Sequence, residues 1–261
     1  MRTLKGIYAI WYRDLLRFLR DRVRIVSSLV QPLLFLFVFG GGLAPAMSGL
    51  AQGNLNFTRF LFPGILSMTI LFTSVFSAVS VVWDREFGFL KEVMVAPIPR
   101  TAVALGKIAG GSSVALVQGL IILLLAPLLG IRVGLAQAFA LVGLMLLLAV
   151  VMSSVGILIA ARMTSTQGFQ MVGQFLLFPM FFLSGAFFPL NGIPLWLTWL
   201  TRIDPVTYGV DPLRQVALQD TVSSKVLDLI RLHPIATDVT VMAVIGLAFM
   251  VPAVWLFGKR D

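Results

Sequence analysis

The sequence predicts an all-α membrane protein, a single transmembrane domain over residues 1–261 with six transmembrane helices. Three observations predict this class. First, six stretches free of charged residues are each long enough to cross a bilayer, because about 20 apolar residues in a helix span about 30 Å of hydrocarbon. Second, only 12% of the residues are charged, and the mean hydropathy is +0.98. Third, most basic residues lie on one side of the predicted spans.

The spans are placed on the charge-free stretches, because one arginine or aspartate at mid-membrane costs about 2.5–3.5 kcal/mol. Charged residues are therefore expected only in the connections. The predicted spans cover residues 26–45, 63–82, 108–130, 135–161, 169–188 and 239–258.

The distribution of basic residues predicts the orientation. Fourteen of the 20 lysines and arginines fall on the side that also holds both termini, and the positive-inside rule assigns that side to the cytoplasm. We therefore expect a multi-pass protein of the inner (plasma) membrane with both termini cytoplasmic. Topology and attraction to membrane lipid explain the net charge of +9 without nucleic acid as a partner.

Residues 1–25 predict an amphipathic elbow helix that lies in the membrane interface before the first span. Its apolar residues recur at helical spacing and fall on one arc, with charged residues on the other. The apolar arc holds Leu4, Ile7, Tyr8, Trp11, Leu15, Phe18 and Leu19. The candidate elbow residues are Trp11, Arg13, Arg17, Phe18 and Arg20. The pattern fits a lipid anchor without a mechanistic role as well as an elbow that also touches a cytoplasmic partner.

The cytoplasmic connection between the second and third spans predicts a short amphipathic helix over residues 84–96. Phe87, Leu90 and Met94 share one helical face, and Pro97 and Pro99 follow the helix and stop it. The charged residues around this face are Asp84, Arg85, Glu86, Lys91 and Glu92. Such a helix is suited to docking into a groove of a partner protein, although a helix lying on the bilayer fits the pattern equally well.

Residues 189–237 predict an outer hairpin and surface segment between the fifth and sixth spans. The run Phe187–Pro194 breaks the helical pattern, and Leu195–Leu200 resumes it without enough length for another crossing. Trp196 and Trp199 are expected in the outer aromatic belt. Asp204–Asp238 mixes charged and apolar residues and predicts a surface helix. Elsewhere, Gly106 and Gly110 form a G-x-x-x-G pair, a weak signal that permits close helix approach.

Catalytic and metal-binding patterns are absent from the sequence. The chain has no cysteine and one histidine, His233, so two-histidine metal sites, thiolate sites and histidine-based triads are excluded. We accordingly expect no catalytic residue and no metal site. No G-x-x-x-x-G-K-[ST] loop is present to hold a nucleotide phosphate. We therefore expect a protein that is not itself an enzyme and that holds no cofactor.

The charge-free spans also bear on the source of energy. A proton- or ion-coupled transporter usually needs an ionisable group inside the membrane, and none lies in the charge-free stretches. Uphill transport would then need energy from another polypeptide, on which ATP and Mg²⁺ would bind. A secondary transporter or channel not powered by ATP is the alternative. An intramembrane enzyme is a third hypothesis, disfavoured by the missing polar catalytic cluster.

Four segments in this order resemble the type-two family of ABC exporter permeases, most closely its daunorubicin-resistance-type members. They are the amphipathic start Trp11–Arg24, the segment Asp84–Arg100 with its Ala96-Pro97 ending, Ser184–Leu190, and Ile203–Arg214 with its Asp-Pro-Val-Thr-Tyr-Gly-Val-Asp-Pro-Leu-Arg run. Together they cover nearly the whole chain.

The resemblance implies six spans in a permease that pairs with a second copy, as a homodimer, and recruits two copies of a separate ABC ATPase subunit. By the same resemblance, Asp84–Met94 is the coupling helix that inserts into the ATPase. Phe187–Leu200 would be a re-entrant hairpin at the outer gate, with Phe187, Phe188, Pro189 and Trp196 as candidate gate residues. The substrate would pass between the two permease copies. Family members export drugs, lipids and glycans, and the charge-free lining with its Phe and Met residues suits an amphipathic or hydrophobic molecule, as in multidrug efflux.

Overall fold

A computed structural model of the chain describes residues 2–43, 56–87 and 99–259, and within these ranges every regular element is helical. The all-α class predicted from the sequence is therefore confirmed. The elements are α1 (Arg2–Arg20), α2 (Arg22–Phe37), the π-helix η1 (Val38–Gly42), α3 (Phe57–Ser77), α4 (Val79–Glu86), α6 (Arg100–Leu123), the 3₁₀-helix η3 (Ala126–Leu129), α7 (Leu135–Ala160), α8 (Thr166–Leu183), α9 (Leu195–Ile203), α10 (Thr207–Leu218), α11 (Ser224–Ile230) and α12 (Ile235–Lys259).

Five helical stretches among the described residues are long and apolar enough to cross a membrane, as a multi-pass membrane protein requires. They are Ile25–Gly42, Phe57–Glu86, Arg100–Leu129, Leu135–Ala160 and Ser224–Gly258. Each overlaps one of the predicted spans, and Phe57–Glu86, Arg100–Leu129 and Ser224–Gly258 begin well before the predicted span. The remaining predicted span, 169–188, falls on α8, an 18-residue helix whose first half carries Gln167, Gln170 and Gln174. These polar residues lower the mean hydropathy of α8, so it is not among the five candidate spans.

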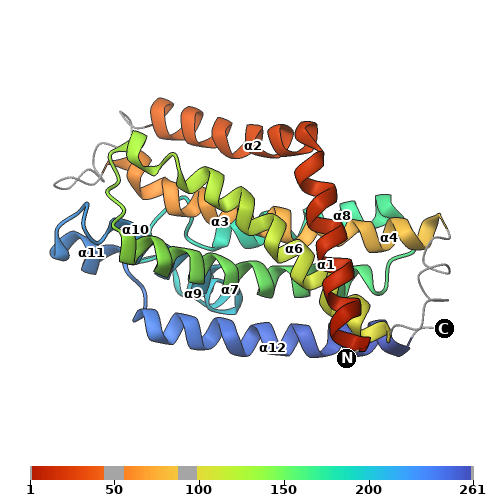
Figure 1. Cartoon of the computed structure of the whole chain (residues 1–261). Helices are drawn as coiled ribbons and strands as arrows, with labels where there is room; N and C mark the ends of the chain where they lie inside the picture. The colour runs from red at the N-terminus through yellow and green to blue at the C-terminus, as the bar shows by residue number, and fades with distance from the viewer. Residues whose placement is uncertain (1, 44–55, 88–98, 260–261) are drawn as a thin grey trace.

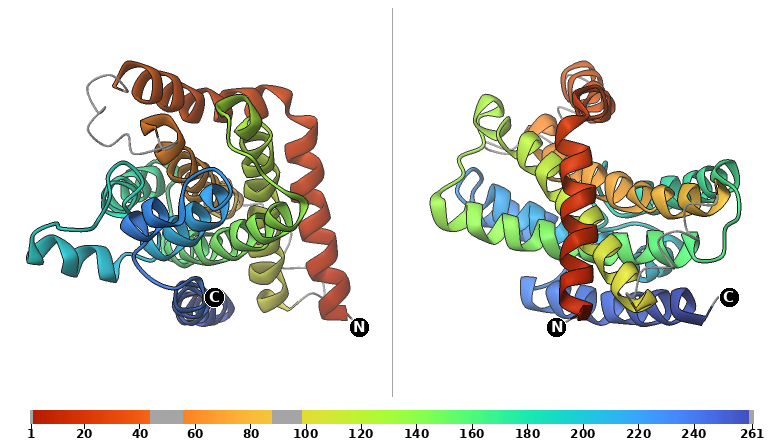
Figure 2. Two further views of the ribbon diagram at one scale, coloured as in Figure 1. Left: turned by 90° about the vertical axis from the view of Figure 1, so that its left-hand side faces the viewer. Right: turned by 45° about the vertical axis from the view of Figure 1, so that its right-hand side comes forward.

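The helices form a bundle around α3 (Figure 1). Helix α3 contacts α2, α6, α7, α8 and α10, and its side chains Leu61, Phe62 and Leu66 are fully buried. Helix α12 packs against α6, α7 and α10, whereas α2 and α8 lie at the edge of the bundle. The left-hand view of Figure 2 shows α9 projecting from the bundle. Burial in the core thus comes mainly from α3 and the helices packed directly on it.

Helix α1 runs across one end of the bundle, at a steep angle to the long helices (Figure 1). We call this the α1 end; the C-terminal part of α12 reaches the same end, and α11 lies at the opposite end, here called the α11 end. Gly106 and Gly110 form the contact with α1, because a Cβ at Gly106 would lie 2.9 Å from the Cβ of Ile10, and one at Gly110 would lie 3.1 Å from the Cβ of Asp14. The glycine pair therefore marks a close helix contact, as its spacing permits.

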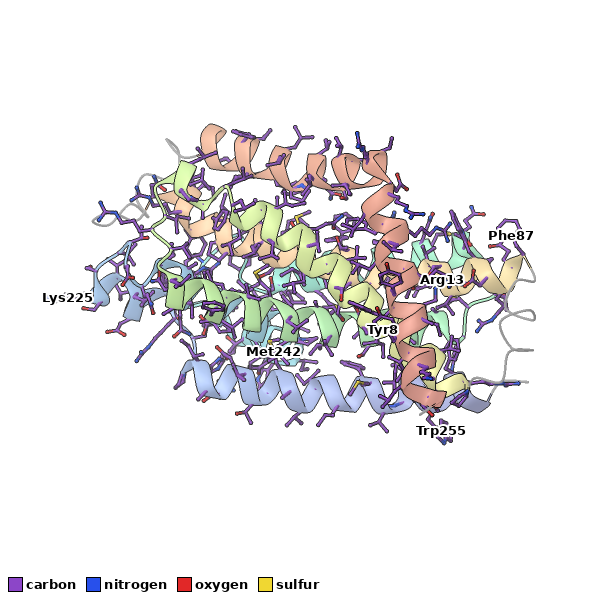
Figure 3. The ribbon with its side chains drawn as sticks, viewed as in Figure 1. Tyr8, Arg13, Phe87, Lys225, Met242 and Trp255 are labelled. Atoms are coloured by element: carbon purple, nitrogen blue, oxygen red, sulfur yellow. The ribbon has the colours of Figure 1, made fainter. Side chains whose placement is uncertain are left out.

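The face that α1 turns to the bundle differs from the apolar arc in the sequence. Ile10 and Phe18 are buried, whereas Leu4, Tyr8 and Leu19 are exposed (Tyr8 is labelled in Figure 3). The wide apolar arc is therefore divided between the bundle and the surroundings. The exposed part is the part that suits a membrane interface.

The prediction of a surface helix within Asp204–Asp238 is wrong for α10, because every residue from Thr207 to Leu218 is buried. The charged residues of α10 have partners inside the protein. Arg214 donates a hydrogen bond of 2.7 Å to the carbonyl oxygen of Gly185, and its guanidinium lies 4.0 Å from the ring centroid of Phe60. A buried charge is tolerated when it is paired in this way, so charge alone gave the wrong location.

Candidate functional site at the α1 end of the bundle

Helix α4 continues the direction of α3 after a break at Ala78 and ends at the α1 end. Its last three residues are Asp84, Arg85 and Glu86. The sequence placed these residues in a separate cytoplasmic helix, 84–96. In the structure they form the last turn of a helix that is connected directly to the core, and each of the three contacts a different part of the bundle.

Asp84 belongs to a network of charges centred on Lys107. The Nζ atom of Lys107 lies 3.1 Å from Asp14 Oδ2 and 3.7 Å from Asp84 Oδ2, and it donates a hydrogen bond of 2.9 Å to Ser80 Oγ. Arg13 adds a longer contact of 3.9 Å to the same oxygen of Asp84. The Lys107 side chain is only 4% exposed. The network thus joins α1, α4 and α6 through one buried ammonium group.

Arg85 and Glu86 connect α4 to both sides of the turn between α7 and α8. The Arg85 guanidinium donates to the carbonyl oxygens of Ala160, at 3.0 Å, and of Met163. Glu86 Oε2 accepts hydrogen bonds from the backbone N–H of Thr166, at 2.9 Å, and from its hydroxyl, at 2.6 Å. A cation at a helix C-terminus and an anion at a helix N-terminus are both favoured by the helix dipole. Arg85 and Glu86 therefore hold the end of α7 and the start of α8.

Among the predicted coupling residues, the structure places four. Phe87 follows α4 directly, and 70% of its surface is exposed at the α1 end (Figure 3). Leu90, Lys91, Glu92 and Met94 lie outside the described residues. Of the predicted apolar face, the structure therefore describes Phe87 alone. Its ring lies next to Asp84, Arg85 and Glu86, which we call the junction.

A pocket of about 560 Å³ opens beside the Lys107 network. Residues of α1, α3, α4, α6 and α8 form its walls. The lining residues are Asp14, Arg17, Phe18, Asp21, Phe76, Ser77, Val79, Ser80, Trp83, Lys107, Gly110, Gly111, Val114, Gln170 and Gln174. The volume lies within the range of small-molecule sites. Aromatic rings and charged or amide groups share the lining, so the pocket offers an apolar surface with polar groups beside it.

The elbow residues have different positions in the structure. Trp11 donates a hydrogen bond of 2.8 Å from Nε1 to the Ser113 hydroxyl of α6, and Phe18 is buried in the pocket wall. Arg17 also lines the pocket, whereas Arg20 is exposed. Arg13 contacts Asp14 and Asp84 (Figure 3). Four of the five elbow residues thus take part in contacts between α1 and the bundle or in the pocket.

The candidate gate residues are brought together only in part. The Phe187 ring packs against those of Phe35 and Phe39 of the first span and of Phe181 and Phe182 of α8, with centroids 5.1–5.8 Å apart. Phe188 and Pro189 are half-buried beside it. Trp196 is exposed on α9. Phe187 therefore joins a phenylalanine cluster between α2 and α8.

Sequence reasoning missed Lys107 and Asp14 as site residues. Charged residues were expected only in the connections; however, Lys107 lies in the second turn of α6 and Asp14 faces it from α1. The available signal was the G-x-x-x-G pair, because Lys107 directly follows Gly106 and Asp14 packs on Gly110. A close helix contact beside a lysine indicates that the lysine needs a partner within that contact.

These features define a class of protein: a helical, multi-pass membrane protein with a pocket at one end. The family model for the ABC-2 type transporter matches residues 5–218. The chain therefore belongs to the ABC-2 type transporter family and is a transport permease, the membrane subunit of an ABC transporter. The resemblance seen in the sequence is confirmed at the level of the family.

Individual relatives agree with this assignment. The chain is 28% identical over 213 residues to the ycf38 protein of Cyanophora paradoxa, which is named as a transport permease, and the match covers 81% of this chain and 73% of that protein. It is 24% identical over 215 residues to the inner membrane transport permease YadH of Escherichia coli (strain K12), with 80% and 81% covered. Nodulation protein J of Rhizobium leguminosarum bv. viciae is 24% identical over 224 residues, with 85% of each chain covered.

Proposed function

We propose that this permease exports an amphipathic or hydrophobic molecule, such as a drug, a lipid or a glycan-type compound, and that a separate ATPase subunit drives it. Two copies of the ATPase would bind ATP and Mg²⁺, and the permease would hold no nucleotide and no ATPase site of its own. The relative YadH is named as an inner membrane permease, and we assign this chain to the same membrane with six spans and both termini cytoplasmic.

The observation that carries this proposal is the junction formed by Asp84, Arg85 and Glu86. These three consecutive residues contact the Lys107 network, the end of α7 and the start of α8. A displacement of the end of α4 would therefore reach several helices at once. Such a junction is what a coupling segment that begins at the end of α4 needs in order to convert movement of an ATPase into movement of the spans.

The pocket at the α1 end supports the choice of substrate class. Phe18, Phe76 and Trp83 supply apolar surface, and Arg17 and Gln170 supply hydrogen-bond donors. A molecule with one apolar and one polar part matches this lining. Since the proposed orientation puts the α1 end at the cytoplasmic face, we infer that the pocket receives substrate from the inner leaflet of the membrane.

The exposed faces of α2 and α8 support a second permease copy and a pathway between the two. Val30 and Leu34 of α2 and Met171 and Phe175 of α8 are exposed apolar side chains, and Phe187 lies between these two helices. We propose that the copies meet along these faces as a homodimer. Phe187, Phe188, Pro189 and Trp196 would then form the outer gate, in a re-entrant hairpin that follows α8.

Replacing Phe87 with alanine tests the ATPase contact. We expect the Phe87→Ala permease to lose at least about tenfold in affinity for its ATPase, because truncating an interface anchor commonly costs about 2 kcal/mol or more. The measurement is co-purification of the ATPase with the permease, followed by transport into vesicles that contain both subunits. Leu90→Ala, on the same predicted face, should act alike.

The matched control is Phe139→Ala, because Phe139 is similarly exposed but lies in the second turn of α7, toward the α11 end. The control should retain the ATPase. Undiminished co-purification by both Phe87→Ala and Leu90→Ala would contradict the proposed coupling helix. The substrate class is tested separately, by stimulation of ATP hydrolysis with a panel of drugs, lipids and glycans.

A further inference from the structure

Three side chains with metal-binding atoms meet away from the α1 end. Asp211 belongs to α10, His233 to the connection between α11 and α12, and Asp238 to the first turn of α12. One ligand atom from each lies within 4.8 Å of the others. We call these three residues the Asp-His-Asp cluster. It is separate from the pocket and from the coupling junction.

Two members of the cluster are held in place by neighbours. Asp211 accepts hydrogen bonds of 3.0 Å from the backbone N–H groups of Leu232 and His233, and a third of 3.0 Å from the Gln215 amide. The His233 ring stacks on the Tyr208 ring, with centroids 5.6 Å apart and planes 19° apart. Both ligand groups are therefore oriented before any ion arrives. In protein metal sites, ligands are commonly oriented by such contacts with neighbouring residues.

Asp238 is the member whose charge has no adequate partner. Its side chain is 0% exposed, and within the described part of the chain neither of its carboxylate oxygens accepts a hydrogen bond. The Nδ1 atom of His233 lies 3.2 Å from Asp238 Oδ1, also without a hydrogen bond. Burying a carboxylate in this way is costly unless a cation or a proton neutralises it. The arrangement thus calls for a positive charge between the three side chains.

We propose that the Asp-His-Asp cluster binds one divalent metal ion of the zinc type. One imidazole and two carboxylates form a ligand set for Zn²⁺, which in open sites takes three protein ligands and a water molecule. With bonds of about 2.0–2.1 Å, two ligands of a tetrahedral ion lie about 3.3 Å apart, and the distance from His233 Nδ1 to Asp238 Oδ1 is 3.2 Å. The two atoms are already at the separation that a shared ion requires.

Asp211 retains the capacity to act as the third ligand. Its Oδ2 atom accepts the three bonds of 3.0 Å, whereas Oδ1 accepts one bond, of 3.2 Å, from the backbone N–H of Leu232. A carboxylate oxygen has two lone pairs, so Oδ1 keeps one position for an ion. The ion would then connect α10 to the start of α12. The expectation of no metal site rested on the lack of a second histidine, whereas this ligand set needs only one.

The test measures Zn²⁺ binding to the purified permease, prepared without a histidine tag. Titration with ZnCl₂ in competition with a chromogenic chelator gives the affinity, and elemental analysis after gel filtration gives the stoichiometry. We expect about one Zn²⁺ per chain for the wild type. We expect Asp238→Asn and His233→Gln each to weaken Zn²⁺ binding by about tenfold or more. Mutating a residue that only supports a ligand commonly lowers metal affinity by about tenfold or more, and a ligand should matter at least as much. Asp228→Asn is the matched control, since Asp228 is an exposed aspartate of α11 paired with Arg231, and it should bind Zn²⁺ like the wild type.

Thermal unfolding supplies a second readout that does not depend on the variants. Bound Zn²⁺ should raise the unfolding temperature of the wild-type permease, because a ligand that binds the folded state stabilises it. Absence of Zn²⁺ binding by the wild type at micromolar concentrations would overturn the proposal and leave a proton as the group that neutralises Asp238. Equal binding by the wild type and by folded Asp238→Asn and His233→Gln variants would overturn it as well.

Discussion

Replacing Lys107 with methionine tests how the α1 end is held together. Methionine keeps most of the length and the apolar part of the side chain, so the change removes mainly the charge. In the structure this charge lies 3.1 Å from Asp14 and 3.7 Å from Asp84, and the Lys107 side chain is only 4% exposed. The two carboxylates would remain in place without their buried cation, with the exposed Arg13 as a cation 3.5 Å from Asp14 and 3.9 Å from Asp84.

The expected cost follows from the burial of these groups. Removing one partner of a fully buried ion pair costs about 3–5 kcal/mol, whereas an exposed pair contributes about 0–1 kcal/mol. The side chains of Asp14 and Asp84 are 18% and 23% exposed, so water partly solvates them when the lysine is lost. We therefore expect Lys107→Met to destabilise the permease by about 2 kcal/mol, between these limits. Arg13→Met should cost under about 1 kcal/mol, because Arg13 is 54% exposed and 3.9 Å from Asp84.

The assay is unfolding of the purified permease in mixed detergent micelles, with the wild type, the two single variants and the double variant Lys107→Met/Asp84→Asn. Neutralising Asp84 removes one of the two carboxylate charges that have lost Lys107, so the double variant should recover part of the loss. Equal stability of Lys107→Met and Arg13→Met would refute the reasoning. It would mean that the buried ammonium contributes no more than a surface charge.

Two further predictions concern packing and pH. A Cβ at Gly156 of α7 would lie 2.7 Å from the carbonyl oxygen of Val75 in α3, so Gly156→Ala should lower stability by about 1–3 kcal/mol; Gly143→Ala, in the same helix but with no atom within 4 Å of the new Cβ, should leave it unchanged or slightly raised in the same unfolding assay. Burial raises the pKa of Asp204, between α9 and α10, from 3.8 to about 8. The folded state therefore holds a proton that the unfolded state has released, and stability should fall as the pH rises from about 4 through about 8. Asp204→Asn should flatten this decline in unfolding temperature, Asp228→Asn should not, and an equal decline in all three proteins would contradict the assignment.

The spans were the part of the fold that the sequence predicted best. A lipid environment forbids unpaired charges and unsatisfied backbone groups, so apolar runs of sufficient length have few alternatives to a helix. Each of the five helical stretches that are long and apolar enough to cross a membrane overlaps one of the predicted charge-free runs. The exception is the predicted span 169–188, which falls on α8. Two glutamines near the start of this helix, Gln170 and Gln174, are among the residues that line the pocket. Local hydropathy is low there because the helix has a polar site beside it.

Long-range pairs were the part that the sequence could not supply. Lys107 contacts Asp14, which is 93 residues away, and Arg214 contacts Gly185, which is 29 residues away. A pattern within one helix describes which face is apolar, but it does not reveal a partner on another helix. The sequence therefore assigned these charged residues to connections or surfaces. The Asp-His-Asp cluster escaped notice for the same reason, since Asp211 joins His233 and Asp238 only in the folded chain.

The position of Glu86 changes which variants are informative about coupling. From the sequence alone, reversal of its charge separates an ATPase-docking helix from a lipid-bound helix, because added positive charge weakens the first and favours the second. In the structure the Glu86 carboxylate accepts two hydrogen bonds from Thr166 at the start of α8. Glu86→Lys would therefore disturb the contact between α4 and α8 whichever surface the segment meets. Phe87, the next residue, makes the sharper probe, because its ring is exposed and its removal leaves the three contacts of the junction in place.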